Sequence, residues 1–214
     1  MAGQLNLKSG SGGTITVTAA DTAGSPVFTV PAETGTALTT GTSTRIIPRA
    51  AVPAGSVLQV VQTVKTDTFA TSFGAVWGDL PGLSVTITPS STDNKILVML
   101  DIKFIGDTDA SISRIRLLRG ATPIYIGNAA SNRPQGSGAQ NYNTSGGSGG
   151  FNVSASGGIF LDSPATTGAV TYKIQGGGDS NATIFYLNRT EGDRDTAYYD
   201  SRTASSITVM EIAA

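Results

Sequence analysis

Acidic residues form two clusters whose spacing could support chemistry. Asp107 and Asp109 flank a threonine, and Glu191, Asp193 and Asp195 alternate with other residues. Alternating carboxylates in a turn can bind a hard cation such as Ca²⁺, and a paired set can hydrolyse a glycosidic bond without histidine or cysteine. Neither cluster matches an EF-hand loop, and no carboxylate pair is singled out by its spacing. We therefore expect solvated turn residues rather than a metal site or a catalytic site.

The chain contains no histidine and no cysteine. Their absence removes the usual general base near neutral pH, the serine–histidine–aspartate triad, thiol nucleophiles, disulfide bonds and the commonest metal ligands. The glycine run at residues 176–178 is not followed by the lysine and hydroxyl residue of a phosphate-binding loop. The sequence therefore predicts a protein that is not an enzyme and that carries no cofactor.

Three arginines lie close together, at Arg114, Arg116 and Arg119. Alternation along a strand places Arg114 and Arg116 on the same face. A phosphate or glycan site is one hypothesis, but we favour a solvated or intersubunit face on which the arginines pair with acids such as Asp101. Trp77, the single tryptophan, is expected to fill the interior of the fold or a subunit interface.

Residues 136–150 form a low-complexity stretch of glycine, serine and asparagine. This composition is typical of a flexible surface loop. The functional alternative is a receptor-contacting tip in which Tyr142 is the aromatic contact and Asn141 and Asn143 supply adaptable polar groups.

The elements that must position these residues are strands. Hydrophobic residues recur with a period of two, turn signals separate the segments, and no long amphipathic helix intervenes. In Lys95–Phe104 one face is apolar and the other is mixed, so a neighbouring subunit could cover the mixed face. Further strands are expected at residues 57–65, 83–88, 113–119, 124–126, 158–161, 170–175, 183–187 and 206–212. The pattern predicts an all-β fold, an antiparallel sandwich or jelly roll.

The first 50 residues are predicted to form a separate part of the chain. Thr14–Thr18 alternates threonine with apolar residues, and Val27–Val30 is a second candidate strand. A two-stranded ribbon is marginal alone in water, so it needs a partner. We assign residues 1–50 to an N-terminal β-ribbon arm with its linker, for attachment and trimerisation, and residues 51–214 to the β-sandwich head.

Charge is scarce in this chain. Charged residues make up 14% of the 214 residues and the formal net charge is −1. We therefore expect no nucleic-acid partner, and little repulsion between associated copies. The first 13 residues lack the apolar run of a signal peptide, and the apolar run Ile96–Leu100 is too short to span a bilayer. The sequence predicts a soluble chain with no membrane insertion.

Several segments share a recognisable pattern. Thr14–Thr18 is followed by Val-Phe-Thr-Val-Pro-Ala-Glu-Thr-Gly-Thr-Ala-Leu-Thr-Thr at residues 27–40. These segments resemble an N-terminal module of tailed-bacteriophage virion proteins of the cyanophage and marine phage type. Residues 53–62, 83–89 and 94–98 resemble the start of the C-terminal β-sandwich of these proteins, and residues 202–212 resemble its end. The resemblance implies a homotrimer with a jelly-roll or TNF-like head.

The resemblance also implies a function and a location. It points to a virion structural protein, made in the host cytoplasm and carried on the tail or capsid surface. The expected role is a tail fibre or receptor-contacting appendage that binds a host-surface glycan or protein. The alternative is a capsid decoration, or cement, protein that stabilises the icosahedral shell, because the chain is short and lacks a repeated shaft. In both roles the N-terminal arm contacts other virion proteins.

Overall fold

The computed structural model describes residues 4–8, 14–18, 52–106, 112–141, 153–179, 184–196 and 198–214. Of residues 4–8, 14–18 and Asn141 only the backbone is described. The chain divides into two compact units, residues 1–47 and 48–214. All the regular structure in these ranges is β-strand, which confirms the predicted all-β class.

The first unit contains a two-stranded antiparallel ribbon. Strand β1 (Gln4–Lys8) pairs with β2 (Thr14–Thr18), with Leu5 opposite Val17 and Leu7 opposite Ile15. The predicted strand at residues 14–18 is therefore present. Its partner β1 was missed, because the glycines and serines around it obscure a short alternation. The other predicted strand, Val27–Val30, lies outside the described residues.

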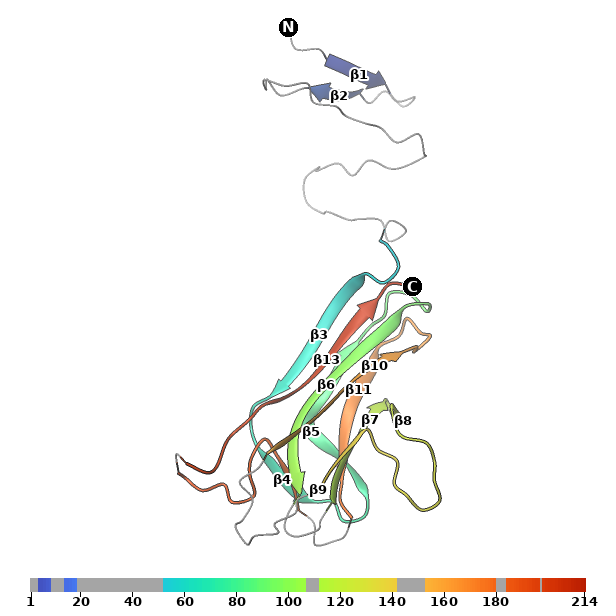
Figure 1. Ribbon diagram of the computed structural model, residues 1–214. Helices are drawn as coiled ribbons and strands as arrows, with labels where there is room; N and C mark the ends of the chain where they lie inside the picture. Colours follow the sequence, from blue (N-terminus) through green and yellow to red (C-terminus); the bar gives the residue numbers. More distant parts are fainter. Residues whose placement is uncertain are drawn as a thin grey trace. The chain divides into compact units, whose positions relative to one another are not determined.

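In the second unit one antiparallel sheet is built around β6 (Lys95–Gly106) (Figure 1). One edge of β6 pairs with β10 (Ser154–Asp162). The other edge pairs first with β13 (Ser205–Ile212) and then with β12 (Ile184–Leu187). Outside these two lie β3 (Val57–Lys65) and β4 (Phe69–Ser72), respectively.

The second antiparallel sheet is built around β11 (Val170–Gly177). It pairs on one side with β5 (Trp77–Ile87) and on the other with β7 (Ile112–Arg119). Strands β8 (Thr122–Ile124) and β9 (Gly138–Asn141) both pair with β7.

The strand order defines a jelly roll. With the short strands β4, β9 and β12 set aside, eight strands of the second unit remain, which are in chain order β3, β5, β6, β7, β8, β10, β11 and β13. The first sheet orders them first, eighth, third, sixth, and the second sheet orders them second, seventh, fourth, fifth. This arrangement of two sheets, each assembled from strands far apart in sequence, is the double-sheet jelly roll.

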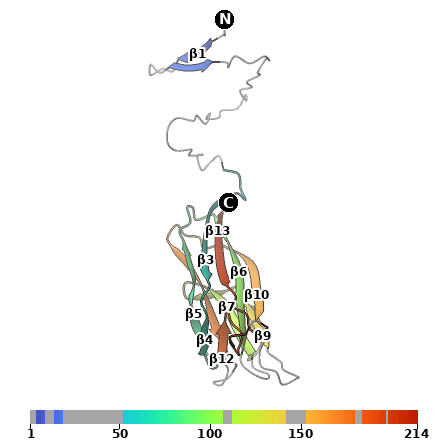
Figure 2. The ribbon, with the colours of Figure 1, turned by 90° about the vertical axis from the view of Figure 1, so that its left-hand side faces the viewer.

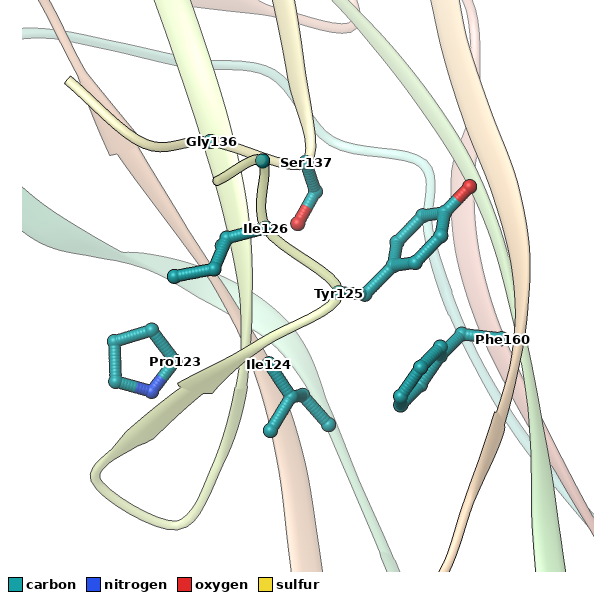
Figure 3. A pocket seen from close by; sticks show the side chains of 8 residues that line it. Pro123, Ile124, Tyr125, Ile126, Gly136, Ser137 and Phe160 are labelled. Carbon is teal, nitrogen blue, oxygen red and sulfur yellow. The ribbon is translucent and has the colours of Figure 1, made fainter. Parts of the chain in front are cut away.

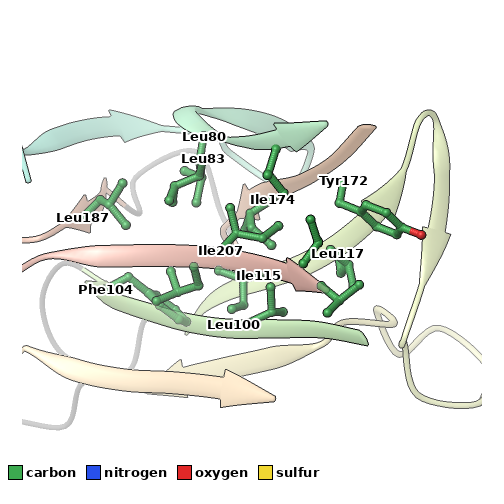
Figure 4. Close-up of a cluster of buried hydrophobic side chains, with 14 of the residues drawn as sticks. Leu80, Leu83, Leu100, Phe104, Ile115, Leu117, Tyr172, Ile174, Leu187 and Ile207 are labelled. Atoms are coloured by element: carbon green, nitrogen blue, oxygen red, sulfur yellow. The ribbon is translucent and has the colours of Figure 1, made fainter. Parts of the chain in front are cut away.

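The core lies between the two sheets, where Figure 4 shows its side chains; Figure 2 shows the same strands as a ribbon, turned by 90° from Figure 1. Alternate residues of each strand point inward, as the period of two requires. The largest fully buried side chains are Tyr172, Phe104, Phe185, Leu83, Ile87, Ile96, Ile102, Ile115, Leu117, Ile174, Leu187 and Ile207. Phe104 and Phe185 stack with ring centroids 5.0 Å apart. The predicted inward face of Lys95–Phe104 is thus confirmed, and its opposite face points out of the sandwich.

Candidate functional site

The acidic cluster at residues 191–195 is a turn stabilised by ion pairs. Asp193 pairs with Arg189 at 3.2 Å and with Arg202 at 2.7 Å. Arg194 pairs with Asp200 at 2.7 Å. No group of three or more acidic residues in the described ranges could hold a metal ion. The other cluster, Asp107 and Asp109, lies outside the described residues.

Asp200 is fixed within the same turn. Its carboxylate accepts hydrogen bonds from the Arg194 guanidinium at 2.7 Å and the Thr190 hydroxyl at 2.5 Å. These two bonds lower the pKa of Asp200 to about 2. A carboxylate held in this way orders a loop and has no role in proton transfer near neutral pH.

Trp77, Arg114 and Arg116 come together on the outer face of the second sheet. The Arg116 guanidinium lies 4.5 Å from the centre of the Trp77 ring, and its Nε donates to Gln175 at 2.9 Å. Arg114 donates to the Gly178 carbonyl at 2.7 Å. The arrangement is a cation–π pair over a polar strand surface.

The structure excludes two of the alternatives predicted for these residues. Trp77 does not fill the sandwich, because its position at the start of β5 places it on the outer face, half-buried beneath Arg116. Asp101 does not pair with the arginines, because it lies in the other sheet and pairs with Lys103. Whether Trp77, Arg114 and Arg116 contact another subunit stays a prediction. Of the predicted receptor-contact loop, Asn141 ends β9, and Tyr142 and Asn143 lie outside the described residues.

The outer side of the first sheet is apolar over four adjacent strands, and we call this surface the apolar face. The strand register aligns its side chains in rows across the sheet. One row consists of Val60, Met210, Leu97 and Leu161. The next consists of Gln62, Thr208, Met99 and Ile159. Val57 and Val64 continue the face along β3.

The apolar face is open to solvent in a single chain. Ile159 is 63% exposed, Val60 55% and Leu161 52%. In the second row the Gln62 side-chain amide donates a hydrogen bond to the Thr208 hydroxyl at 2.8 Å, which pairs the two polar side chains with each other. Six of the exposed large hydrophobic residues of the described chain lie on this one face: Val57, Val60, Val64, Met99, Ile159 and Leu161.

A second surface, which we call the loop groove, lies along the excursion between β8 and β9. Its apolar part is a hollow of about 690 Å³. Figure 3 shows the rings of Tyr125 and Phe160 along one side, and Pro123, Ile124 and Ile126 along the other. The two rings lie 5.3 Å apart at an angle of 34°.

The loop groove continues into a polar hollow of about 360 Å³. The two hollows share Gly127, Gly136 and Ser137. The loop that forms them is fixed to the second sheet: Ser137 donates its backbone N–H to the Ile115 carbonyl at 2.8 Å, and its hydroxyl accepts from Leu117 N–H at 2.9 Å. The polar hollow is lined in addition by Arg114, Asn128, Ala130, Arg133, Pro134, Gln135, Gly138 and Ala139.

Sequence reasoning found these two surfaces only in part. The sequence predicts a candidate subunit face on the outward side of Lys95–Phe104. Val57–Val64 also has apolar residues on both of its faces, and this signal could have added β3 to the predicted surface. The loop groove was missed, because Tyr125, Ser137 and Phe160 are brought together only by the fold. Tyr125 itself was assigned to a strand.

Comparisons with known proteins give a distant structural likeness. No family model and no curated protein sequence matches the chain. The structure is similar to a T=1 particle derived from infectious bursal virus, with a TM-score of 0.37, 8% identity, and coverage of 92% of this chain and 46% of that one. It is also similar to the infectious bursal disease virus VP2 subviral particle, with a TM-score of 0.32, 10% identity, and coverage of 72% and 41%. The chain thus spans less than half the length of either protein, and similarity this distant does not extend to function.

Proposed function

We propose that this chain is a homotrimeric structural protein of a virion, carried as a tail fibre or receptor-contacting appendage. The apolar face is the observation that carries the proposal. The largest contiguous apolar patch on a soluble monomer is typically about 300–600 Å² and is often functional, and larger patches mark interaction sites. Jelly rolls are shared by viral coat proteins and lectins, which supports the setting by analogy of fold. The segments that resemble tailed-phage virion proteins support it independently.

The occupant we propose for the apolar face is a second copy of the chain, and the size of the face supports this. Four strands about 4.8 Å apart and about eight residues long, at about 3.4 Å per residue, span roughly 19 by 27 Å. That is about 500 Å² before the relief of the side chains is added. A standard interface buries about 800 Å² per partner, and a threefold ring divides this face between two neighbours, so the face supplies part of the area that association buries.

Charge also favours a second copy. The two central rows contain no charged residue, and the chain has a net charge of −1, so association desolvates little charge and meets little repulsion. The face is apolar from β3 at one edge to β10 at the other. In a closed ring the β3 side of one copy can therefore meet the β10 side of the next, which is the heterologous contact that threefold symmetry requires.

Light scattering of the intact chain tests the assembly. We expect a mass three times the 21.7 kDa of one chain. Val60→Glu should give a folded monomer, because it places a charge in the apolar face. Val76→Glu, at a residue that is 66% exposed outside the face, is the matched control and should remain trimeric. A wild-type monomer at micromolar concentration would refute the proposal.

The receptor-contacting role is tested on cells. If copies bind weakly at identical sites, a trimer gains avidity through effective concentration. Purified trimer should bind host cells and reduce virion adsorption, and Val60→Glu monomer should do so far less well. Trimer that neither binds cells nor competes with virions would exclude this role.

The alternative function is capsid decoration. It is supported by the division of the chain into two compact units, because residues 1–47 could clamp the shell while the head trimerises. Copy number and location separate the two roles. Labelled imaging of intact virions should mark the tail for a fibre and the whole capsid surface for a cement protein. Loss of capsid occupancy after deletion of residues 1–47 would support decoration over the fibre role.

A further inference from the structure

We propose that the loop groove binds an acidic carbohydrate, that is, a sugar chain bearing carboxylates. The proposal depends on the receptor-contacting role only for the biological source of the ligand. It adds the chemical class of the ligand and the residues that recognise it.

The aromatic wall of the groove suits the flat face of a sugar ring. Tyr125 is 38% exposed and leans on Phe160. The face of an aromatic ring carries partial negative charge, so the polarised C–H bonds of a pyranose pack favourably against it. Pro123 and Ile126 lie on the opposite side of the hollow, as Figure 3 shows, so a bound sugar ring would lie between them and the aromatic rings.

Tyr125 is held in place before any ligand arrives. Its φ is 50°, a left-handed conformation that is unusual for an aromatic residue. Its ring packs over Gly158, where an added Cβ would lie only 2.5 Å from the Tyr125 Cε1. Strained residues persist where the surroundings hold them and cluster at ligand sites. A wall that is already ordered costs a ligand little conformational entropy on binding.

The polar hollow selects for negative charge. Arg114 and Arg133 line it, and the described residues that line the two hollows include no aspartate or glutamate. Arg133 has no ion pair with any residue that the structure describes. Guanidinium groups recognise carboxylates through paired hydrogen bonds. Because the whole chain has a net charge of −1, this local excess of positive charge is not the consequence of a basic protein.

The remaining polar groups suit hydroxyls. The Ser137 hydroxyl accepts a hydrogen bond from the Leu117 N–H, which leaves its own proton available to donate. The Gln135 Nε2 donates to the Gly127 carbonyl at 2.5 Å, which leaves its oxygen to accept. An uncharged donor and an uncharged acceptor beside an aromatic wall match sugar hydroxyls, each of which can both donate and accept a hydrogen bond.

Calorimetry with the intact chain tests the site. Trigalacturonic acid is the probe and neutral galactotriose is its comparison. We expect the acidic trisaccharide to bind at least tenfold more tightly, with a preference that falls as salt is raised. Tyr125→Ala should abolish binding of both sugars, and Tyr125→Phe should restore it. Arg133→Gln should remove the preference for the acid and leave the weak binding of the neutral sugar.

Matched controls lie in the 191–202 turn. Tyr198→Ala, at a residue that is 87% exposed, and Arg202→Gln should leave both affinities unchanged. Equal binding of the two sugars, no binding by the folded chain at millimolar concentration, or binding that survives Tyr125→Ala would each overturn the proposal. The proposed function is tested by other measurements: light scattering for the trimer and adsorption to cells for receptor contact. A negative calorimetric result would therefore overturn the sugar site without overturning the proposed function.

Discussion

At the scale of single residues, Glu211 is the most tightly held acid of the head. It lies on the inner side of β13 and is 1% exposed. Its carboxylate accepts hydrogen bonds from the Ser90 hydroxyl at 2.6 Å, from Asn94 at 2.5 Å and from Gln59 at 2.7 Å. Burial raises the pKa of Glu211, but the hydrogen bonds together outweigh it and bring the pKa to about 2.

This cluster predicts an acid-dependent stability. The folded pKa lies below the ordinary value of 4.5, so the stabilisation is complete above about pH 4.5 and is lost as the pH falls towards 2. The difference corresponds to about 3 kcal/mol at neutral pH. Urea unfolding between pH 7 and pH 2 should show this loss. Glu211→Gln should be less stable than the wild type at pH 7, and its free energy of unfolding should fall much less between pH 7 and pH 2. If it falls as steeply as in the wild type, Glu211 is not the source of the acid dependence.

A second buried polar contact joins the two sheets. The Tyr172 hydroxyl donates to Asp162 at 2.7 Å, and Arg119 pairs with the same carboxylate at 2.9 Å. Burial and the neighbouring carboxylate raise the pKa of Tyr172 far above its usual range, so the hydroxyl remains a donor. Tyr172→Phe should therefore lower the free energy of unfolding by about 2 kcal/mol, measured by denaturant at pH 7. The control variant Lys173→Gln, on the outer face of the same strand, should lower the free energy of unfolding much less than Tyr172→Phe does.

Residues of this kind mark the limit of what the sequence predicts. Glu211 and Asp162 look like ordinary strand residues until the fold brings distant donors around them. The same holds for Tyr125 in the loop groove, whose wall is completed by Phe160. The inward positions of β6 were predictable, because alternation alone sets which side chains share a face.

At the scale of elements, β13 is the strand on which the first sheet depends. It is the last strand of the chain, yet it pairs with β3 on one side and β6 on the other. Removing residues 205–214 would delete the core residues Ile207 and Val209, expose the side chains that pack against them, and leave the facing edges of β3 and β6 unpaired. We expect the truncated chain to be insoluble or unfolded by circular dichroism. A soluble, cooperatively folding product would show that β3 and β6 can close the sheet without it.

The strand boundaries show what local patterns predict well. Val57–Lys65 was predicted with the observed bounds, and most other strands were placed within a few residues. The first half of β5 was missed because Gly78, Pro81 and Gly82 are typical of turns, and yet Trp77–Asp79 pairs with β11 across a bulge. Strands β4 and β9 were missed as well, since each has only four residues and pairs with strands distant in sequence.

At the scale of the whole molecule, the two compact units raise the question of where self-association resides. The apolar face belongs entirely to the unit of residues 48–214. The N-terminal ribbon was predicted to attach and to trimerise, and the described part of it is two strands of five residues. Because the chain has two compact units, attachment and trimerisation can be tested separately by dividing it between residues 47 and 48.

No helix in the described ranges is long and apolar enough to cross a membrane.

A chain that begins at residue 48 should fold and remain trimeric, because it keeps the complete core and the apolar face. Its thermal midpoint should lie within a few degrees of that of the intact chain. Light scattering and calorimetry measure both properties, and Leu161→Glu in the shortened chain should convert the trimer to a folded monomer. If the shortened chain is instead a stable monomer while the intact chain is a trimer, the association energy lies in residues 1–47. The apolar face would then need a different partner, such as another virion protein, and the ribbon would be the trimerisation element.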